Sequence, residues 1–203
     1  MISTIICGLS EVLIPGLKGA KEPPAGTSRA AGDVILERLV AEDLQGLCVG
    51  DMTEEEFCHR LLDRAGWPTD IEHLRAAIRE RFRGQVPGTA DVLRGLRGRY
   101  RMVLMTDHAR EWIKDIRLYH REILEIFDRS FFSYDLRRTK AEAGTFRMVL
   151  GLLGDQPDEC LLIDDEQVNL AAAAAAGIEG ILFENADQLA AALADRGISP
   201  QAA

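Results

Sequence analysis

Short apolar runs alternate with stretches of helical spacing over most of the chain. The runs that predict buried strands are residues 4–7, 100–105, 130–133, 161–163 and 178–183. The stretches that predict helices among them are residues 89–97, 110–119, 123–127, 143–153 and 167–176. Strands that alternate with helices pair in parallel through right-handed crossovers, so the pattern predicts an α/β fold with a five-stranded parallel sheet and helices on both faces.

A block of helices with no strand between them follows the first predicted strand. It is preceded by a stretch rich in proline, glycine and lysine, residues 15–28, which is typical of an exposed connection. Helical spacing then predicts helices at residues 28–47, 53–66 and 70–82. We therefore expect a helical domain of residues 15–83, inserted into a core domain that consists of residues 1–14 and 84–203.

Two adjacent acids, Asp164 and Asp165, end the apolar run at residues 161–163. Open α/β sheets bind ligands at the carboxyl ends of their strands, where these carboxylates are expected to lie. One of them could instead cap the following helix. That helix contains six alanines at residues 171–176, and such small side chains allow a helix to lie close to a sheet.

Composition and charge narrow the class of protein. The chain has 203 residues, enough to bury a substantial core, and no apolar stretch long enough to cross a bilayer. The first ten residues lack the pattern of a secretion signal, so we expect a cytoplasmic protein. A net charge of −9 without a basic stripe argues against nucleic acid as a partner. The four cysteines are scattered, which favours reduced packing residues over disulfides or a metal site.

The polar residues at the predicted strand ends resemble the motifs of one family. The run from Met102 to Asp107 is similar to an apolar strand that ends in the threonine of the second motif. Lys140 is similar to the lysine of the third motif, and the run from Leu162 to Asp165 with Asn169 downstream is similar to the fourth. In order and spacing, the chain resembles the haloacid dehalogenase-like hydrolases with a helical cap, over nearly its whole length.

This resemblance implies a three-layer Rossmann-like core with an inserted cap, and a site where four loops converge on one anion. In the family, an aspartate after the first strand is the nucleophile, and a second aspartate two residues later transfers the proton in the phosphatases. The resemblance further implies that Thr106, Asp107 and Lys140 bind the transferring group. Asp164 and Asp165 would then hold Mg²⁺.

The first motif departs from the family pattern. Gly8 stands where the nucleophilic aspartate belongs, and Ser10 stands where the acid/base aspartate belongs. No neighbouring aspartate can replace them, because residues 1–31 contain none. Cys7 is a nucleophile by type, but side chains alternate along a strand, so it should face a helix layer. Glu11 is the one nearby carboxylate, and it could approach a metal or simply be solvated.

Three functions remain open on these grounds. The chain could be a catalytically inactive binding or regulatory member, which we favour. It could be a weak hydrolase that uses Mg²⁺-bound water, or a structural subunit whose cap contacts a protein partner or a second copy. We expect weak Mg²⁺ binding at Asp164 and Asp165, with Glu11 as an open third candidate, and modest binding of a small phosphorylated or carboxylated metabolite.

The histidines and two aromatic residues are expected to have structural roles rather than catalytic or metal-binding ones. His108 is expected in an exposed loop, and the remaining histidines lie in predicted helices without the spacing of metal ligands. Phe57 and Trp67 are expected to pack within the cap.

Overall fold

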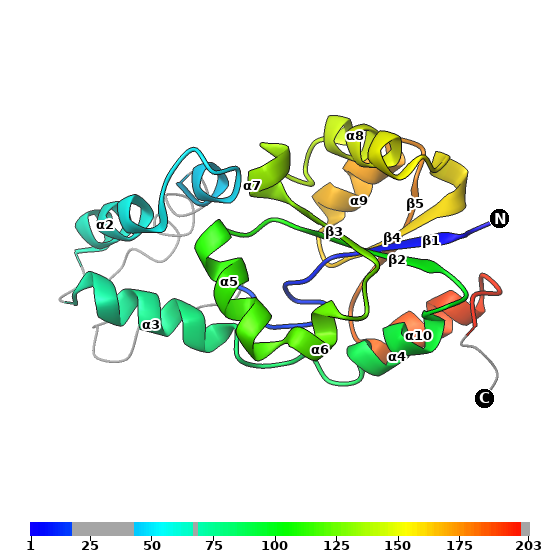
Figure 1. Ribbon diagram of the computed structural model, residues 1–203, viewed down its shortest axis with the longest axis horizontal. Coiled ribbons are helices and arrows are strands. Elements are labelled where there is room, and N and C mark those ends of the chain that lie inside the picture. The colour runs from blue at the N-terminus through cyan, green and yellow to red at the C-terminus, as the bar shows by residue number, and fades with distance from the viewer. Residues whose placement is uncertain (18–42, 67–68, 200–203) are drawn as a thin grey trace.

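A computed structural model describes residues 1–17, 43–66 and 69–199 of the chain. Its centre is a five-stranded sheet with the order β3-β2-β1-β4-β5, and every adjacent pair is parallel (Figure 1). The strands are β1 (Thr4–Cys7), β2 (Arg101–Thr106), β3 (Arg129–Phe132), β4 (Cys160–Asp164) and β5 (Glu179–Leu182). The five-stranded parallel sheet expected from the sequence is thus confirmed.

Helices connect consecutive strands, and the first three of the labelled helices lie between β1 and β2 in the sequence. The helices are α2 (Glu54–Ala65), α3 (Ile71–Arg81), α4 (Thr89–Leu96), α5 (Arg110–Tyr119), α6 (Arg121–Leu124), α7 (Ser133–Leu136), α8 (Ala143–Leu153), η1 (Pro157–Glu159), α9 (Gln167–Ala174) and α10 (Ala186–Ala194). Residues 43–48 are also helical. Because the strand and helix patterns are local in sequence, most of these bounds agree with the expected ones within a few residues.

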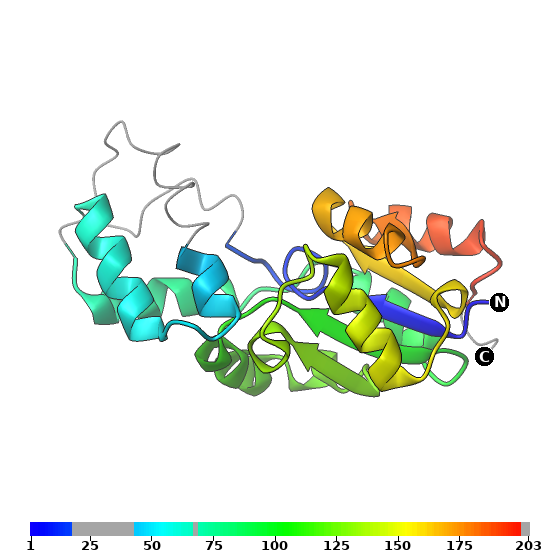
Figure 2. The same ribbon diagram turned by 90° about the horizontal axis from the view of Figure 1, so that it is seen from above.

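The alternation of side chains along the strands produces two apolar layers. Ile5 and Cys7 of β1 belong to the larger apolar cluster, with residues of α4, α5, α6 and α10. Ile6 points to the opposite face and packs in a second cluster with residues of α8 and α9. The helices lie on the two sides of the sheet accordingly (Figures 1 and 2). Cys7 therefore faces a helix layer, as expected from its place in the strand.

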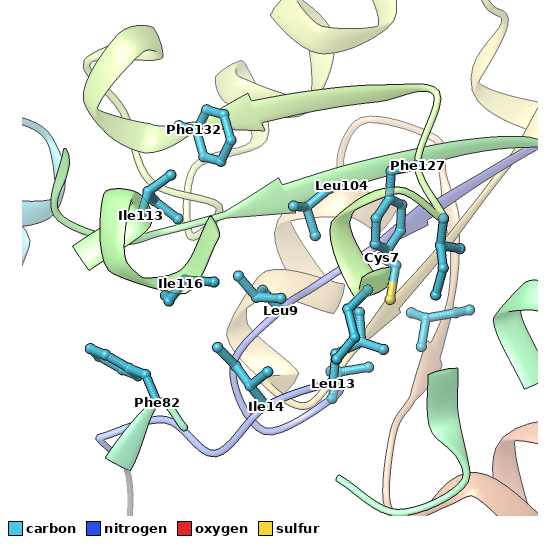
Figure 3. Packing of buried hydrophobic residues seen from close by; sticks show 14 of the residues in the cluster. Cys7, Leu9, Leu13, Ile14, Phe82, Leu104, Ile113, Ile116, Phe127 and Phe132 are labelled. Carbon is cyan, nitrogen blue, oxygen red and sulfur yellow. The ribbon is translucent and has the colours of Figure 1, made fainter. Parts of the chain in front are cut away.

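The loop after β1 is itself part of the core. Leu9, Leu13 and Ile14 are fully buried beside Phe82, Ile113 and Ile116 (Figure 3). This packing fixes the backbone that carries Ser10 and Glu11, since the residues on both sides of them are anchored in the apolar cluster.

The helical region, which consists of residues 43–48, α2 and α3, lies at one end of the sheet beside α5 (Figure 1). Thr53 and Glu56 form the capping box of α2, and apolar side chains of this region join the core cluster. Its two connections to the sheet run together, because the Val86 N–H donates to the Leu13 carbonyl at 2.9 Å. Both contacts are consistent with an inserted cap, whose boundaries at residues 15 and 83 remain a prediction.

Some of the expected features fall on residues outside the described part of the chain, and two helices were not expected. Most of the helix expected at residues 28–47, and Trp67, lie outside the described part of the chain. Phe57 was expected to pack within the cap; it is buried, and its ring packs edge-on against Trp112 of α5. The helices α7 and α10 were not expected from the sequence. Over the described residues, no helix combines the length and apolarity that a membrane crossing requires.

Candidate functional site

The carboxyl ends of β1, β2 and β4 bring the expected site residues to one edge of the sheet. Gly8 follows β1, Thr106 ends β2 and Asp164 ends β4. Because β1 lies between β2 and β4 in the sheet, Gly8 is central among them. The Gly8 N–H donates to the Ile163 carbonyl at 2.9 Å, which fixes the backbone of Gly8 beside the end of β4.

A buried ion pair lies directly against Gly8. The Lys140 ammonium donates to Oδ2 of Asp164 at 2.6 Å, and both side chains are almost completely buried. A Cβ atom built on Gly8 would lie 2.9 Å from the same Oδ2 atom and 3.4 Å from Nζ of Lys140. The space that a side chain at position 8 needs is therefore occupied by this pair.

Asp164 is fully committed to partners within the chain. Its Oδ1 atom accepts from the Glu166 N–H at 3.0 Å and from Nδ2 of Asn169 at 2.8 Å, while Oδ2 accepts from Lys140. It thus bonds the backbone just before α9, but it does not cap that helix, because the N-cap residue is Glu166 and no side-chain hydrogen bond caps the first turn. Although burial disfavours the charge of Lys140, Asp164 and Asp107 raise the pKa of its ammonium, so the Lys140 side chain is charged at neutral pH.

A chain of three hydrogen-bonded side chains forms the opposite wall of the site. His108 Nδ1 lies 2.6 Å from Oγ1 of Thr106, and His108 Nε2 lies 2.9 Å from Oγ of Ser10. The expectation that His108 is exposed was wrong, because only 3% of its surface is accessible and its ring packs edge-on against Phe82. Burial, and next the charge of Lys140, lower the pKa of His108 to about 3, so the imidazole is neutral.

Asp107 and Glu11 hold the backbone around the site. The Asp107 carboxylate accepts from the backbone N–H of Lys140, with 3.0 Å to Oδ2. Burial raises the pKa of Asp107, and Lys140 partly offsets that effect. Glu11 has a left-handed backbone conformation with φ 59°, and its Oε1 atom accepts from the Gly16 N–H at 3.0 Å. Both acids therefore have structural partners besides any ligand.

A cavity of about 230 Å³ opens beside these residues. Its polar lining consists of Ser10, Glu11, Thr106, Asp107, His108, Lys140, Asp165, Glu166 and Asn169, and its apolar lining includes Leu17, Leu44, Phe82, Trp112 and Val168. Leu44 precedes α2 in the helical region, so the cavity lies between that region and the sheet. Gly8 and Asp164 do not line it. The cavity is thus lined by the Ser10 and Thr106 side chains and by Lys140, but not by Gly8.

The arrangement does not fit a magnesium ion. Mg²⁺ requires an octahedral set of oxygen ligands and is usually held by one or two carboxylates that face it. Here both oxygens of Asp164 have donors within the chain, and Gly8 supplies no carboxylate. Among the described residues, no group of three or more acidic, histidine or cysteine side chains gathers closely enough to hold a metal.

The five-stranded parallel sheet with helices on both faces defines a Rossmann-like α/β fold. The sequence model of the haloacid dehalogenase-like hydrolase family matches residues 34–177 of the chain. That match spans well over half of the 203 residues, so the chain belongs to the haloacid dehalogenase-like hydrolase family.

Individual relatives are more distant. A segment of 70 residues, or 34% of this chain, is 39% identical to the chloroplastic flavin mononucleotide hydrolase 1 of Arabidopsis thaliana, and it spans 29% of that protein. The chain therefore matches less than a third of the length of that curated relative.

Solved structures share the fold at low sequence identity. A family enzyme from Bacteroides thetaiotaomicron superposes with a TM-score of 0.68 at 18% identity, over 91% of this chain and 94% of that chain. A predicted hydrolase of the family from Porphyromonas gingivalis gives 0.69 at 19% identity, over 97% and 98%. The L-2-haloacid dehalogenase of Xanthobacter autotrophicus gives 0.63 at 15% identity, over 98% and 85%. At these identities the likeness establishes the fold.

Sequence reasoning missed His108 as a residue of this site. Its position two residues beyond the end of β2 was a usable signal, because a strand end in this sheet leads directly to the ligand edge. What the pattern could not provide was the direction of its side chain, which is set by packing against Phe82 and Trp112.

Proposed function

We propose that this chain is a member of the family that has lost phosphoryl transfer and binds a small phosphorylated or carboxylated ligand in the cavity. The observation that carries the proposal is the position of Gly8. A nucleophilic carboxylate there would collide with Asp164, and the cavity does not extend to that point. The scaffold is retained, while the reacting group and the space for it are absent.

The polar lining favours binding over turnover. The Thr106 hydroxyl and the Lys140 ammonium can both donate to an anionic group, and apolar residues provide a wall for the rest of the ligand. Lys140 is the one lysine or arginine among the described lining residues, and Asp164 already neutralises it. Since Glu11, Asp107, Asp165 and Glu166 add negative charge, we expect modest affinity for an anion.

The relatives support a phosphorylated ligand. The curated relative from Arabidopsis thaliana is named for hydrolysis of flavin mononucleotide, which is a phosphate ester. The enzyme from Bacteroides thetaiotaomicron has been solved with magnesium and inorganic phosphate, both as the wild type and as an aspartate-to-alanine variant. In that fold, phosphate is thus held even where one aspartate has been replaced.

The loss of phosphoryl transfer is tested by turnover. Purified protein with Mg²⁺ and several phosphomonoesters, including flavin mononucleotide, should release no phosphate above the uncatalysed rate, since loss of a covalent nucleophile costs on the order of a millionfold. Robust release that depends on Mg²⁺ and is abolished in Asp164→Ala would overturn this part, and it would point to a hydrolase that uses metal-bound water. Calorimetric titration with Mg²⁺ should likewise give no micromolar affinity.

Ligand binding is tested by thermal stabilisation. Phosphate, vanadate or tungstate should raise the melting temperature of the wild type, because a ligand that binds only the folded state stabilises it. Asp165→Asn should increase that shift by removing a lining carboxylate, and Asp187→Asn on α10 is the matched control. Equal shifts in both variants, or no shift with any anion, would contradict binding in the cavity.

A further inference from the structure

Ser10 and His108 have the geometry of a nucleophile and its base. Ser10 Oγ lies 2.9 Å from His108 Nε2, within the range of a hydrogen bond, and the other ring nitrogen lies 2.6 Å from Thr106 Oγ1. A hydroxyl bonded to an imidazole that is oriented by a third group is the arrangement by which serine is activated. The proposed loss of phosphoryl transfer depends on Gly8 and does not involve Ser10 or His108.

We propose that Ser10 is a nucleophile activated by His108, and that it takes the acyl group from small carboxylic esters that bind in the cavity. Both residues line the cavity, so an ester that enters can reach them. Ser10 is only half-buried, whereas His108 is held by Phe82 and Trp112 on its other sides. The proposal goes beyond the binding function, because it concerns a different bond and a different residue.

One of the two neutral tautomers of His108 suits this chemistry. If Nδ1 carries the proton, it donates to Thr106 Oγ1, and Nε2 is left to accept from the Ser10 hydroxyl. Burial keeps the imidazole neutral, so the base is available at neutral pH. The same burial makes it a weak base, which limits the rate of acyl transfer. Thr106 is a positioning residue here, since it acts through the imidazole.

The reaction balances without any further reactant except water. Ser10 Oγ attacks the ester carbonyl carbon while its proton passes to Nε2 of His108. The bond to the alcohol oxygen breaks, and the alcohol leaves with that proton. Water then attacks the acyl-serine, gives a proton to Nε2, and releases the carboxylic acid as Ser10 regains its proton. Lys140 lines the same cavity, and its ammonium is the positively charged group there that would stabilise the developing oxyanion.

The test is covalent labelling with a fluorophosphonate probe. The Ser10 oxygen would form a bond to phosphorus, fluoride would leave, and peptide mass spectrometry would locate the adduct. We expect one adduct per chain, at Ser10, with none in Ser10→Ala. His108→Gln should label about 100-fold more slowly, the lower end of what a general base contributes. Hydrolysis of p-nitrophenyl acetate should follow the same order.

Controls separate activation from folding. Thr106→Ser, which keeps the hydroxyl, should label faster than Thr106→Val, which leaves the buried Nδ1–H of His108 without its acceptor; the melting temperatures of both variants are measured beside the labelling rates. Urea-unfolded wild type should not label. Absence of an adduct at Ser10 in the folded wild type, or labelling of a folded His108→Gln as fast as the wild type, would overturn the proposal whatever the phosphatase assays show. Phosphate release, by contrast, bears only on the binding function.

Discussion

The Nζ atom of Lys140 lies 2.6 Å from Oδ2 of Asp164, at the point to which a side chain on residue 8 would extend. From the resemblance to the family, Lys140 was expected to hold the transferring group and Asp164 to hold Mg²⁺. Here they bind each other, so the charges of both are satisfied without a ligand. The pair is a buried contact between β4 and the loop before α8.

Removing one partner of this pair should be strongly destabilising. Lys140→Met leaves the Asp164 carboxylate buried without its cation, and breaking a buried pair in this way costs about 3–5 kcal/mol. Urea denaturation should show this loss of unfolding free energy. Lys114→Met, at an exposed position of α5, is the matched control and should stay within about 0.5 kcal/mol of the wild type.

The double variant tests whether charge is the cause. Lys140→Met with Asp164→Asn removes both charges and keeps an oxygen for the donors of α9, so it should recover most of the lost stability. If the double variant were as unstable as Lys140→Met alone, packing of the lysine stem would be the cause instead.

Gly8→Ala should destabilise the fold although the change is a single methyl group. The added Cβ would lie 2.9 Å from Asp164 Oδ2, an atom held by the pair, and overpacking of this kind costs about 1–3 kcal/mol. Gly151→Ala in α8 is the control: no atom lies within 4 Å of its Cβ, so replacing a helical glycine should stabilise by about 0.5–1 kcal/mol. Thermal melting of both variants, shifted in opposite directions, would confirm the prediction.

The sheet and most helices could be predicted because their signals are local. Alternation along β1 and helical spacing in α5 each depend on neighbours within one element. The strand-end positions of Thr106 and Asp164 follow from the same local patterns, since a parallel sheet brings its carboxyl ends to one edge.

The contacts within the site could not be predicted from those patterns. That Lys140 binds Asp164, and that His108 is buried between Ser10 and Thr106, depends on residues brought together from different elements. Side-chain direction in a loop has no sequence period, so position alone could not distinguish a buried histidine from an exposed one. The same holds for Glu54 of α2, which sequence reasoning gave no role and which the structure buries among charged groups.

Glu54 connects the helical region to the core through a buried network. Arg79 of α3 donates to both oxygens of Glu54, at 2.7 and 2.9 Å, and Trp112 Nε1 of α5 donates to Oε1 at 2.8 Å. Arg79 also donates to Asp115 of α5 at 2.6 Å. Because Trp112 lines the cavity, this network ties the position of the helical region to the cavity wall.

Glu54→Ala should therefore lower the unfolding free energy by about 1–3 kcal/mol, since it leaves the indole N–H of Trp112 without this acceptor and the partly buried Arg79 with one carboxylate partner fewer. Glu55→Ala is the matched neighbour: its side chain is exposed, so its change should stay within about 0.5 kcal/mol. Urea denaturation followed by tryptophan fluorescence measures both. Similar effects of the two substitutions would show that the buried network does not anchor the helical region.

The last prediction concerns the acid sensitivity of the fold at His108. Burial, followed by the charge of Lys140, lowers the pKa of this imidazole from 6.5 to about 3, and its direct contacts are the hydroxyls of Ser10 and Thr106 and the rings of Phe82 and Trp112. Between these two pH values the unfolded chain binds a proton that the folded chain does not. Stability should therefore be complete above pH 6.5 and fall as the pH is lowered through this window.

From pH 7 to pH 5, this single group should lower the unfolding free energy by roughly 2 kcal/mol, because each pH unit below the unfolded pKa contributes about 1.4 kcal/mol. Other titrating groups are common to the wild type and His108→Gln, so the difference between their two pH responses isolates the histidine. Urea denaturation at both pH values should show a smaller loss in His108→Gln than in the wild type. Equal losses would mean that His108 takes up its proton in the folded chain, which would place a charged imidazole beside Ser10 and remove the neutral base on which acyl transfer depends.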